Sequence, residues 1–310
     1  MHIVQIFKSP ILNDNRILNS AKHFDQKGIK TTLIGIDNSN HEYIVDQGKI
    51  TKIKTISLQS RKIFKKGSIP GYFLKVPEAY FKILLRLRKE KFDVIIVNDN
   101  QFYGLFPFLF LLYRKKVIVW DMHELPHPIM LNKITKKYIL YLIQKLDLVI
   151  YTNTFRQKYL ESVINFQKKP FHILNNFPNR HFIEQPKNPL PDYLKFNNSK
   201  PYVLWMGKTV ENRGFDEFMK AMRKNYDKIN VVIMGRLENF IPNEQETDGS
   251  LKVIWAKPEQ IAEILDNSLV TYIFYNSNLQ NLWFCEPNRF YQALARKVTV
   301  ITGNNPLFKA

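Results

Sequence analysis

The chain has 310 residues, 45% of them hydrophobic and 14% aromatic, which suits two domains of about 150 residues, each with a buried core. Its single cysteine, Cys285, excludes a disulfide framework, and the longest apolar run falls short of the ~20 residues of a membrane span. The balance of 46 basic and 27 acidic residues gives a net charge of +19, which attracts anions such as nucleotide phosphates and anionic lipid head groups.

Nucleic acid is disfavoured as a partner, because the sequence contains no zinc-finger spacing, RNP-like aromatic motif or basic-leucine heptad. The apolar run of the N-terminal segment MHIVQIFKSP is too short for a signal peptide. We therefore expect a cytoplasmic location, with peripheral attachment to the inner face of the cell membrane left open.

The first forty residues predict a β-α-β unit. Residues 3–7 form an apolar strand, Asn13 or Asp14 caps a helix, and Gly28 ends that helix before a strand over 31–36. Such a unit implies a parallel sheet with a right-handed crossover. Further strands are predicted over 94–97, 117–120 and 148–151. The first half is therefore a doubly wound α/β domain, whose ligands bind beyond the carboxyl ends of its strands.

A segment dense in Pro and Asn, residues 175–201, interrupts this alternation and is typical of an interdomain region. Strands are then predicted over 202–206, 231–234, 253–255, 269–274 and 298–301, and helices over 215–226, 259–265 and 288–295. The sequence therefore predicts an α/β protein with two Rossmann-like doubly wound domains, residues 1–180 and 201–310, joined by a linker over 181–200.

The segment WDMHELPHP contains HELPH, the letters of a His-Glu-x-x-His zinc site. That site requires a helix, which brings both histidines to one face. Pro126 lacks a backbone N–H and disfavours a helix, and residues 117–120 just upstream are predicted as a buried strand. We therefore predict a strand running out into a loop, assign no metal to it, and give His127 no role.

Two predicted strands of the second half end in a glycine followed by a cation. VLWMGKTVENRGFDEF has Gly207 after a strand, with Lys208 and Arg213 ahead of a helix. VVIMGRLEN has Gly235 and Arg236 in the same arrangement. Glycine lets a backbone approach a ligand, and cations near a helix N-terminus flank an anion. For each motif alone, the alternative of an ordinary turn glycine stays open.

Taken in order, these motifs resemble family 4 of the glycosyltransferases, which have the two-domain GT-B fold. The start of the second half resembles the family's strand, Gly, basic residue and basic-Gly pair, and CEPNRFYQALA resembles its Pro-Asn-Lys-x-x-Glu helix. SPILNDNRIL looks like its first strand-to-helix loop, and DMHELP like a strand-end Asp-x-His-Glu found in many members. The likeness extends over nearly the whole chain.

The resemblance implies a glycosyltransferase that moves a sugar from a nucleotide-sugar donor to a glycan or lipid-linked acceptor, in bacterial surface polysaccharide synthesis. The first domain would serve the acceptor side and the second would bind the nucleotide-sugar. Fixed cations would neutralise the leaving diphosphate without a metal or another cofactor, since the sequence has no Asp-x-Asp. Family members of this type retain the anomeric configuration.

The resemblance also implies roles for particular residues. His123 would lie at the interdomain cleft beside sugar and acceptor, a hydrogen-bonded loop histidine being the alternative. Lys208 and Arg213 would be the catalytic cations that meet the diphosphate. The acceptor side would include Asp14, Arg16 and Glu124, the last orienting His123 or capping a turn. The donor-binding residues would be Gly207, Gly235, Arg236, Glu286, Pro287, Asn288, Arg289 and Gln292.

Three departures from the family pattern leave other classes open. Gln292 and Phe284 stand where the family has two acidic residues, and Glu286 is out of register. The first loop lacks paired glycines, and the chain ends at Ala310 just after a strand, so the second domain is expected to be shortened. A catalytically degenerate GT-B binding or scaffold protein is one alternative, and a nucleotide-sugar epimerase of the same fold is another.

The basic and aromatic stretch over residues 60–91 raises contact with an anionic membrane surface as a hypothesis. Its helical part places cations on one stripe, Lys82, Arg86 and Lys89. The opposite stripe is apolar, with Phe81, Leu84, Leu85 and Leu87. The alternative is a helix that packs this apolar side on the sheet and leaves a solvated basic face.

Overall fold

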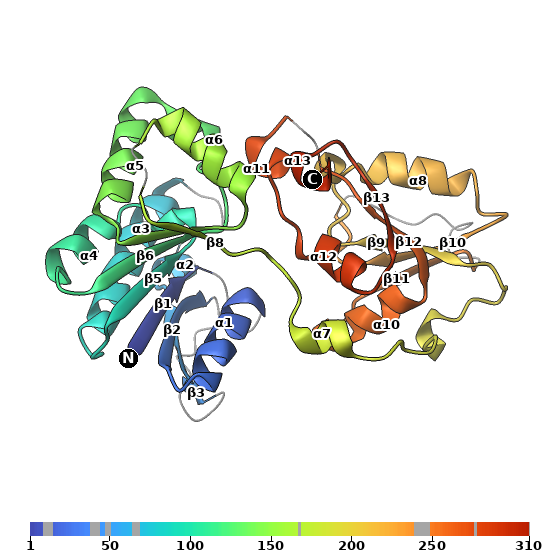
Figure 1. Ribbon diagram of the computed structural model, residues 1–310, viewed down its shortest axis with the longest axis horizontal. Helices are drawn as coiled ribbons and strands as arrows, with labels where there is room; N and C mark the ends of the chain where they lie inside the picture. The colour runs from blue at the N-terminus through green and yellow to red at the C-terminus, as the bar shows by residue number, and fades with distance from the viewer. Residues whose placement is uncertain are drawn as a thin grey trace. The chain divides into compact units, whose positions relative to one another are not determined.

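The computed structural model describes residues 1–8, 15–37, 44–46, 51–63, 69–166, 169–238, 249–275 and 278–309. The chain divides into two compact units, Met1–Leu174 (unit 1) and Asn175–Ala310 (unit 2), and each contains its own sheet (Figure 1). Both sheets are built mainly from parallel strands with helices between them, which confirms the predicted α/β class with two Rossmann-like domains.

Unit 1 contains an eight-stranded sheet in the order β3-β4-β2-β1-β5-β6-β7-β8. Its strands pair in parallel except β3, which runs antiparallel to β4. The strands are β1 His2–Phe7, β2 Lys30–Asp37, β3 Ile44–Asp46, β4 Thr51–Ser57, β5 Val94–Asn98, β6 Val117–Met122, β7 Leu148–Tyr151 and β8 Phe171–Ile173. The helices are α1 Asn15–Gln26, α2 Ser60–Ile63, α3 Ile69–Leu87, α4 Phe106–Leu112, α5 Lys133–Lys145 and α6 Thr154–Ile164, with the 3-10 turns η2 Asn100–Phe102 and η3 Pro128–Leu131.

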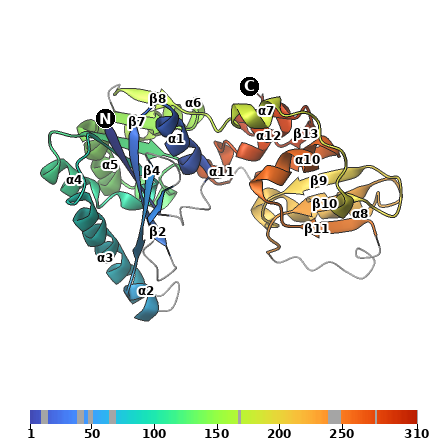
Figure 2. The same ribbon diagram turned by 90° about the horizontal axis from the view of Figure 1, so that it is seen from below.

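Successive side chains of β1 point to opposite faces of this sheet. Gln5 donates from Nε2 to the hydroxyl of Ser20 at 3.0 Å, and Phe7 packs with Ile17, so α1 covers the face of the odd-numbered residues. Helices α3, α4 and α5 lie on the other side of the strands (Figure 2). This division follows from the strand order, because right-handed crossovers in opposite directions along a sheet place their helices on opposite faces.

Unit 2 contains a five-stranded parallel sheet in the order β11-β10-β9-β12-β13. The strands are β9 Tyr202–Met206, β10 Asn230–Met234, β11 Leu251–Ile254, β12 Ser268–Ile273 and β13 Thr299–Thr302. The helices are α7 Arg180–Glu184, α8 Phe215–Arg223, α10 Ile261–Asp266, α11 Gln280–Trp283, α12 Asn288–Ala295 and α13 Pro306–Lys309, with the turns η4 Asp192–Leu194, η5 Glu211–Arg213 and η6 Pro258–Gln260.

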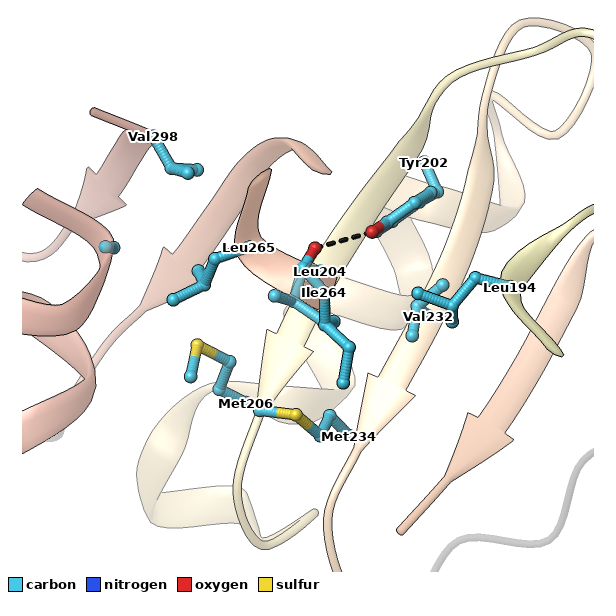
Figure 3. Close-up of a cluster of buried hydrophobic side chains, with 10 residues drawn as sticks. Leu194, Tyr202, Leu204, Met206, Val232, Met234, Ile264, Leu265 and Val298 are labelled. Carbon is cyan, nitrogen blue, oxygen red and sulfur yellow. Dashed lines mark hydrogen bonds between the residues drawn. The ribbon is translucent and has the colours of Figure 1, made fainter. Parts of the chain in front are cut away.

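One core cluster of unit 2 lies between the sheet and α10 (Figure 3). The hydroxyl of Tyr202, at the start of β9, donates to the carbonyl of Ile264 at 2.5 Å and so satisfies its polar end within the core. Met206 and Met234, the last residues of β9 and β10, are also buried in this cluster. The packing therefore fixes the carboxyl ends of these two strands.

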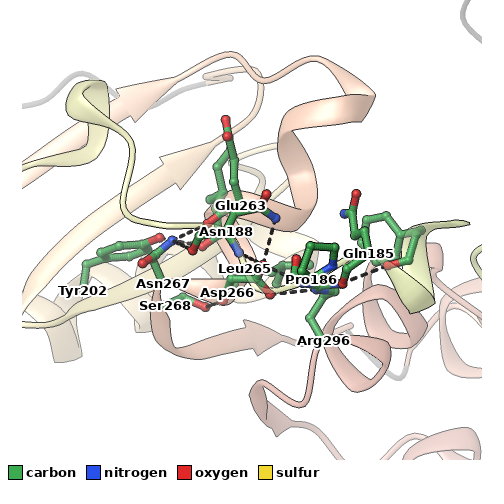
Figure 4. A network of polar contacts seen from close by, with 12 residues as sticks. Gln185, Pro186, Asn188, Tyr202, Glu263, Leu265, Asp266, Asn267, Ser268 and Arg296 are labelled. Carbon is green, nitrogen blue, oxygen red and sulfur yellow. Dashed lines mark hydrogen bonds and ion pairs between the residues drawn. The ribbon is translucent and has the colours of Figure 1, made fainter.

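The segment predicted as a linker, residues 181–200, is part of unit 2. Leu194 is buried in the core cluster, and Asn188 donates its backbone N–H to Asp266 at 2.9 Å. The guanidinium of Arg296 donates to the carbonyls of Gln185 and Pro186 (Figure 4). The Pro- and Asn-rich composition therefore marks an irregular segment that is bound by side chains of unit 2. This segment is not an unattached linker between domains.

The predicted orientation of α3 is wrong. Leu87 is buried, but Phe81 and Leu85 are exposed and therefore do not pack on the sheet. Lys82, expected in solvent, donates from Nζ to the carbonyl of Ser57 at 2.7 Å. Ile83 is fully buried, so the sheet-facing stripe is rotated from the predicted one. None of the helices in the described ranges is long and apolar enough to cross a membrane.

Candidate functional site

The carboxyl ends of β9 and β10 meet at two glycines. Gly207 donates its N–H to the carbonyl of Met234 at 2.8 Å. A Cβ at Gly235, whose φ is +152°, would lie 2.3 Å from the carbonyl oxygen of Gly207, so this position requires glycine. The two strand-to-loop turns are therefore held together by direct backbone packing.

Two guanidinium groups converge beside Gly207. A Cβ at this residue would lie 2.8 Å from Nη1 of Arg213 and 3.3 Å from Nη1 of Arg289. Arg213 ends η5, where Gly214 turns the chain with φ +68° into α8, and Arg289 lies in the first turn of α12. The ring of Tyr275, just after β12, contacts both groups, at 5.6 Å from Arg213 and 5.1 Å from Arg289.

Arg289 is buried and incompletely paired. Its Nη1 donates to the carbonyl of Met206, but Nε and Nη2 are buried and make no hydrogen bond. Burial and the neighbouring Arg213 charge lower the pKa of Arg289, against the stabilising effect of Tyr275. Within the described part of the chain no carboxylate forms a salt bridge with either arginine. An unpaired buried charge is costly, so the arrangement suits an anion bound from outside.

The sequence suggested that Lys208 and Arg213 converge on one point, but in the structure Lys208 pairs elsewhere. Its Nζ lies 3.0 Å from Glu238, and the same carboxylate lies 4.0 Å from Nε of Arg236. Thr209 holds Glu238 there, because its hydroxyl accepts the N–H of Glu238 at 2.7 Å and donates to its carbonyl at 2.9 Å. The structure thus separates the predicted cations into an arginine pair, with Arg289 buried and Arg213 half-buried, and a second group in which Lys208 and Arg236 are exposed beside Glu238.

The other predicted donor-binding residues near α12 differ in how buried they are and in what they contact. Glu286 is buried, and Oε1 accepts the N–H of Asn176 at 2.8 Å, so its observed partner is the start of unit 2. Pro287 precedes the first turn of α12, Asn288 is exposed in that turn, and Gln292 is half-buried one turn later. From this helix, Arg289 alone contributes a side chain to the convergence at Gly207.

A second polar cluster lies in unit 1 at the carboxyl end of β6. Nε2 of His123 is 3.0 Å from Oδ2 of Asp121 and 3.3 Å from Oδ1 of Asn98. Asn98 donates its Nδ2 to the carbonyl of Ile6, which leaves its oxygen facing the histidine. Two acceptors at Nε2 require the proton there in the neutral ring, so Nδ1, buried and without a partner, carries a lone pair. Arg156 donates to the carbonyl of His123.

The acceptor-side predictions change in two ways. Asp121, rather than Glu124, orients His123: Glu124 is exposed, and its backbone carbonyl accepts from Nδ2 of Asn100 at 2.6 Å. Arg16 lies half-buried in the first turn of α1, whereas Asp14 lies outside the described residues.

HELPH forms no helix. β6 ends at Met122, residues 123–127 form a loop, and Nδ1 of His127 accepts the N–H of Ile129 at 3.3 Å. A strand running out into a loop is therefore confirmed for this segment. In the described ranges, no group of three or more His, Cys, Asp or Glu side chains is placed to hold a metal ion.

Sequence reasoning missed Tyr275, Glu238 and Asp121. Tyr275 follows an apolar strand and reads as its continuation, and Glu238 lies in VVIMGRLEN but is neither the glycine nor the cation that defines that motif. The clearest available signal was Asp121, which lies two residues before His123 at a predicted strand end and can therefore reach the same edge of the sheet.

No family model matches the chain, and no curated protein matches it in sequence. Solved structures match its fold. A trehalose-6-phosphate synthase from E. coli bound with UDP-2-fluoro glucose has a TM-score of 0.69 at 11% identity, over 98% of this chain and 85% of that chain. A UDP-forming α,α-trehalose-phosphate synthase from Burkholderia xenovorans has 0.68 at 11% identity, over 98% and 84%. Another from that organism, in complex with glucose-6-phosphate, has 0.61 at 10% identity, over 98% and 85%.

These structures are GT-B glycosyltransferases, and the chain has their fold, as its motifs implied. Likeness at 11% identity establishes the architecture, whereas residue roles have to be argued from the site itself.

Proposed function

We propose that the protein is a glycosyltransferase that binds a nucleotide-sugar in unit 2 and transfers its sugar to an acceptor. The observation that carries the proposal is the buried, incompletely paired guanidinium of Arg289 beside Arg213 at the carboxyl end of β9, whose Nε and Nη2 have no hydrogen-bond partner. Ligands of doubly wound folds bind at such strand ends, and a diphosphate offers the charge and acceptor oxygens that two guanidinium groups need. The fold shared with UDP-forming synthases supports a nucleotide-sugar as the source of that diphosphate.

The proposed chemistry depends on charge at the leaving group. As the bond between the sugar and the diphosphate breaks, negative charge grows on the phosphate oxygens. Arg213 and Arg289 are already held by Tyr275 and by the Met206 carbonyl, so little reorganisation is needed when that charge develops. Their contribution is therefore larger in the transition state than in the bound donor.

The finer features of the reaction are also proposals. Transfer is expected to retain the anomeric configuration and to require no metal. The acceptor oxygen bonds to the anomeric carbon as the phosphate oxygen departs, and the departing diphosphate takes the acceptor's proton. His123 would accept a hydrogen bond from a sugar hydroxyl through the buried Nδ1 lone pair.

The acceptor is proposed to be a glycan or a lipid-linked sugar of bacterial surface polysaccharide synthesis. One structural neighbour is in complex with glucose-6-phosphate, so a sugar phosphate is the first alternative acceptor to test. A sugar phosphate would be accepted without a membrane, whereas a lipid-linked acceptor would be presented at one.

Calorimetric titration with a panel of nucleoside diphosphates, beginning with UDP, tests the donor site. At a ligand concentration of a hundred times Kd, binding should also stabilise the fold by about 2.7 kcal/mol. Failure of every nucleoside diphosphate to bind would reject the donor site. Binding without release of diphosphate from the matching nucleotide-sugar, with either acceptor class, would instead indicate the degenerate binding protein.

A further inference from the structure

The solvent-exposed side of α3 carries a stripe of apolar residues. Leu74, Pro77, Phe81 and Leu85 follow one another at intervals of three and four residues, and all four are exposed, Phe81 by 63%. This spacing places them on one stripe that is about 17 Å long at 1.5 Å per residue. A surface helix normally turns such a stripe toward its own core.

The neighbouring helix α4 has the same character. Phe108, Leu111 and Leu112 are exposed on it, Leu111 by 60%. The two helices are adjacent, since the Tyr80 hydroxyl on α3 donates to the carbonyl of Gln101 at 2.9 Å, just ahead of α4. Both lie on the same side of the sheet (Figure 2). The exposed apolar side chains therefore belong to one face of unit 1, which we call the α3–α4 face.

Exposed cations follow the C-terminal end of each of these helices, and the helices themselves contain few carboxylates. Arg88 and Lys89 are exposed just after α3, and Arg114 and Lys115 just after α4. The sequences of α3, α4 and α5 contain a single carboxylate, Glu78. That carboxylate is already engaged: it lies 2.8 Å from Nζ of Lys82 and accepts the backbone N–H groups of Gln59 and Ser60.

We propose that the α3–α4 face docks on an anionic lipid membrane. Apolar side chains enter the boundary between head groups and acyl chains, while cations at the helix ends meet the anionic head groups. The net charge of +19 favours this occupant over a second copy of the chain, which would bring two such faces into repulsion. Nucleic acid would use the cations but leave Phe81 and Leu111 in water. The proposal does not depend on the donor site in unit 2.

Flotation of the full chain with phosphatidylcholine vesicles, with and without phosphatidylglycerol, tests the proposal. Binding is expected only to the anionic vesicles, and should weaken as salt is raised. Arg88→Gln with Lys89→Gln should weaken binding roughly thirtyfold, because each cation near an anionic surface contributes ~1 kcal/mol. Lys22→Gln with Lys27→Gln removes the same charge from exposed positions at α1, on the other face of the sheet, and should leave binding unchanged.

The apolar contribution needs its own variant. Phe81→Gln with Leu85→Gln should reduce binding at least tenfold, whereas Ile183→Gln with Leu190→Gln, at exposed positions of unit 2, should not. The two α3 positions are exposed, so the thermal midpoint should not change and a folding defect is separable.

Several outcomes would overturn the proposal. One is equal binding to neutral and anionic vesicles, or to neither. Another is binding that follows the cations alone and is displaced by a DNA duplex, which would assign the face to nucleic acid. A third is a concentration-dependent dimer in light scattering that Phe81→Gln with Leu85→Gln abolishes, without vesicle binding, which would assign it to self-association.

Discussion

Arg296 binds Asp266 through two nitrogens on one edge of its guanidinium: Nε donates to Oδ1 at 2.7 Å and Nη2 to Oδ2 at 2.6 Å, with the two side chains 3% and 1% exposed. The pair joins α10 to the end of α12 and also binds the irregular segment around Asn188 (Figure 4). Burial opposes ionisation of Asp266, but hydrogen bonds from Arg296 and Asn188 outweigh it and lower its pKa. Unit 2 therefore depends on an ion pair that is satisfied on both sides.

Asp266→Asn should destabilise unit 2 by about 3–5 kcal/mol, because it leaves the Arg296 charge buried without its counter-ion. Urea unfolding, with hydrogen exchange used to assign the transition to unit 2, measures this loss. Asp192→Asn is the matched control, since Asp192 pairs with Lys195 at an exposed site. Equal transitions in the two variants would show that the buried pair contributes nothing.

The acid stability of α3 should depend on Glu78. Burial favours its neutral form, but hydrogen bonds from Lys82, Ser60 and Gln59 outweigh this and lower the pKa of Glu78 to about 2. A lowered pKa means that the unfolded chain binds the proton more readily. The contribution to stability is therefore complete above the unfolded pKa of about 4.3 and is lost as the pH falls toward 2.

Hydrogen exchange in peptides that cover α2 and α3 reports this loss directly. Protection should fall between about pH 4 and pH 2 in the wild type. In Glu78→Gln it should be lower at neutral pH and change less over the same range. A wild-type profile that Glu78→Gln does not alter would exclude the carboxylate as the cause.

Local signals predicted the framework of the fold well. The apolar strand over 148–151, the strand over 202–206 and the helix over 288–295 have the predicted bounds, because buried parallel strands are short apolar runs and Pro287 marks a helix start. Two strands that were not predicted, β4 and β8, have weaker sequence signals. β8 has only three residues and is largely exposed, and β4 alternates Lys and Thr with Ile in a segment that reads as polar.

The site was predicted less completely, because its contacts join distant strand ends. Gly207, Arg213 and Arg289 were assigned to the donor, but their convergence on Tyr275 depends on where β12 ends in the sheet. The predicted partnership of Lys208 with Arg213 is not seen, because Thr209 holds Glu238 next to Lys208. The rotation of α3 was unpredictable from periodicity alone, since both of its sides carry apolar residues.

Arg289→Met should weaken ligand binding without lowering the stability of the ligand-free protein. Loss of charge-assisted hydrogen bonds worth roughly 1.5–3 kcal/mol should weaken nucleoside diphosphate binding by about ten- to a hundredfold. The ligand-free variant should unfold at or above the wild-type midpoint, because an apolar side chain replaces a buried, incompletely paired charge. Calorimetry and thermal unfolding measure the two effects. Arg180→Met, at an exposed i,i+4 pair, is the control, and wild-type affinity in Arg289→Met would remove the arginine pair from the donor site.

Glu238→Gln should strengthen nucleoside diphosphate binding by about two- to fivefold. An exposed ion pair contributes up to ~1 kcal/mol, and removing the carboxylate frees Lys208 to meet an anion instead. In a Lys208→Met background the same substitution should have little effect, so a double-mutant cycle by calorimetry isolates the contact. Weaker binding in Glu238→Gln would show that the carboxylate itself contacts the ligand.

In the neutral ring of His123 the buried Nδ1 has a lone pair, because Asp121 and Asn98 both face Nε2. A hydrogen bond between neutral groups contributes about 0.5–1.5 kcal/mol, so His123→Ala should lower kcat/KM for sugar transfer about two- to tenfold. The affinity for the nucleoside diphosphate alone should not change, since its proposed site lies in unit 2. Asp121→Ala should lower transfer in part and shift the ring toward a mixture of tautomers, visible by ¹⁵N NMR of the imidazole. Glu124→Gln is the control, because that side chain is exposed and the carboxylate that pairs with the ring is that of Asp121. Wild-type transfer in His123→Ala would leave His123 as a structural histidine of the loop after β6.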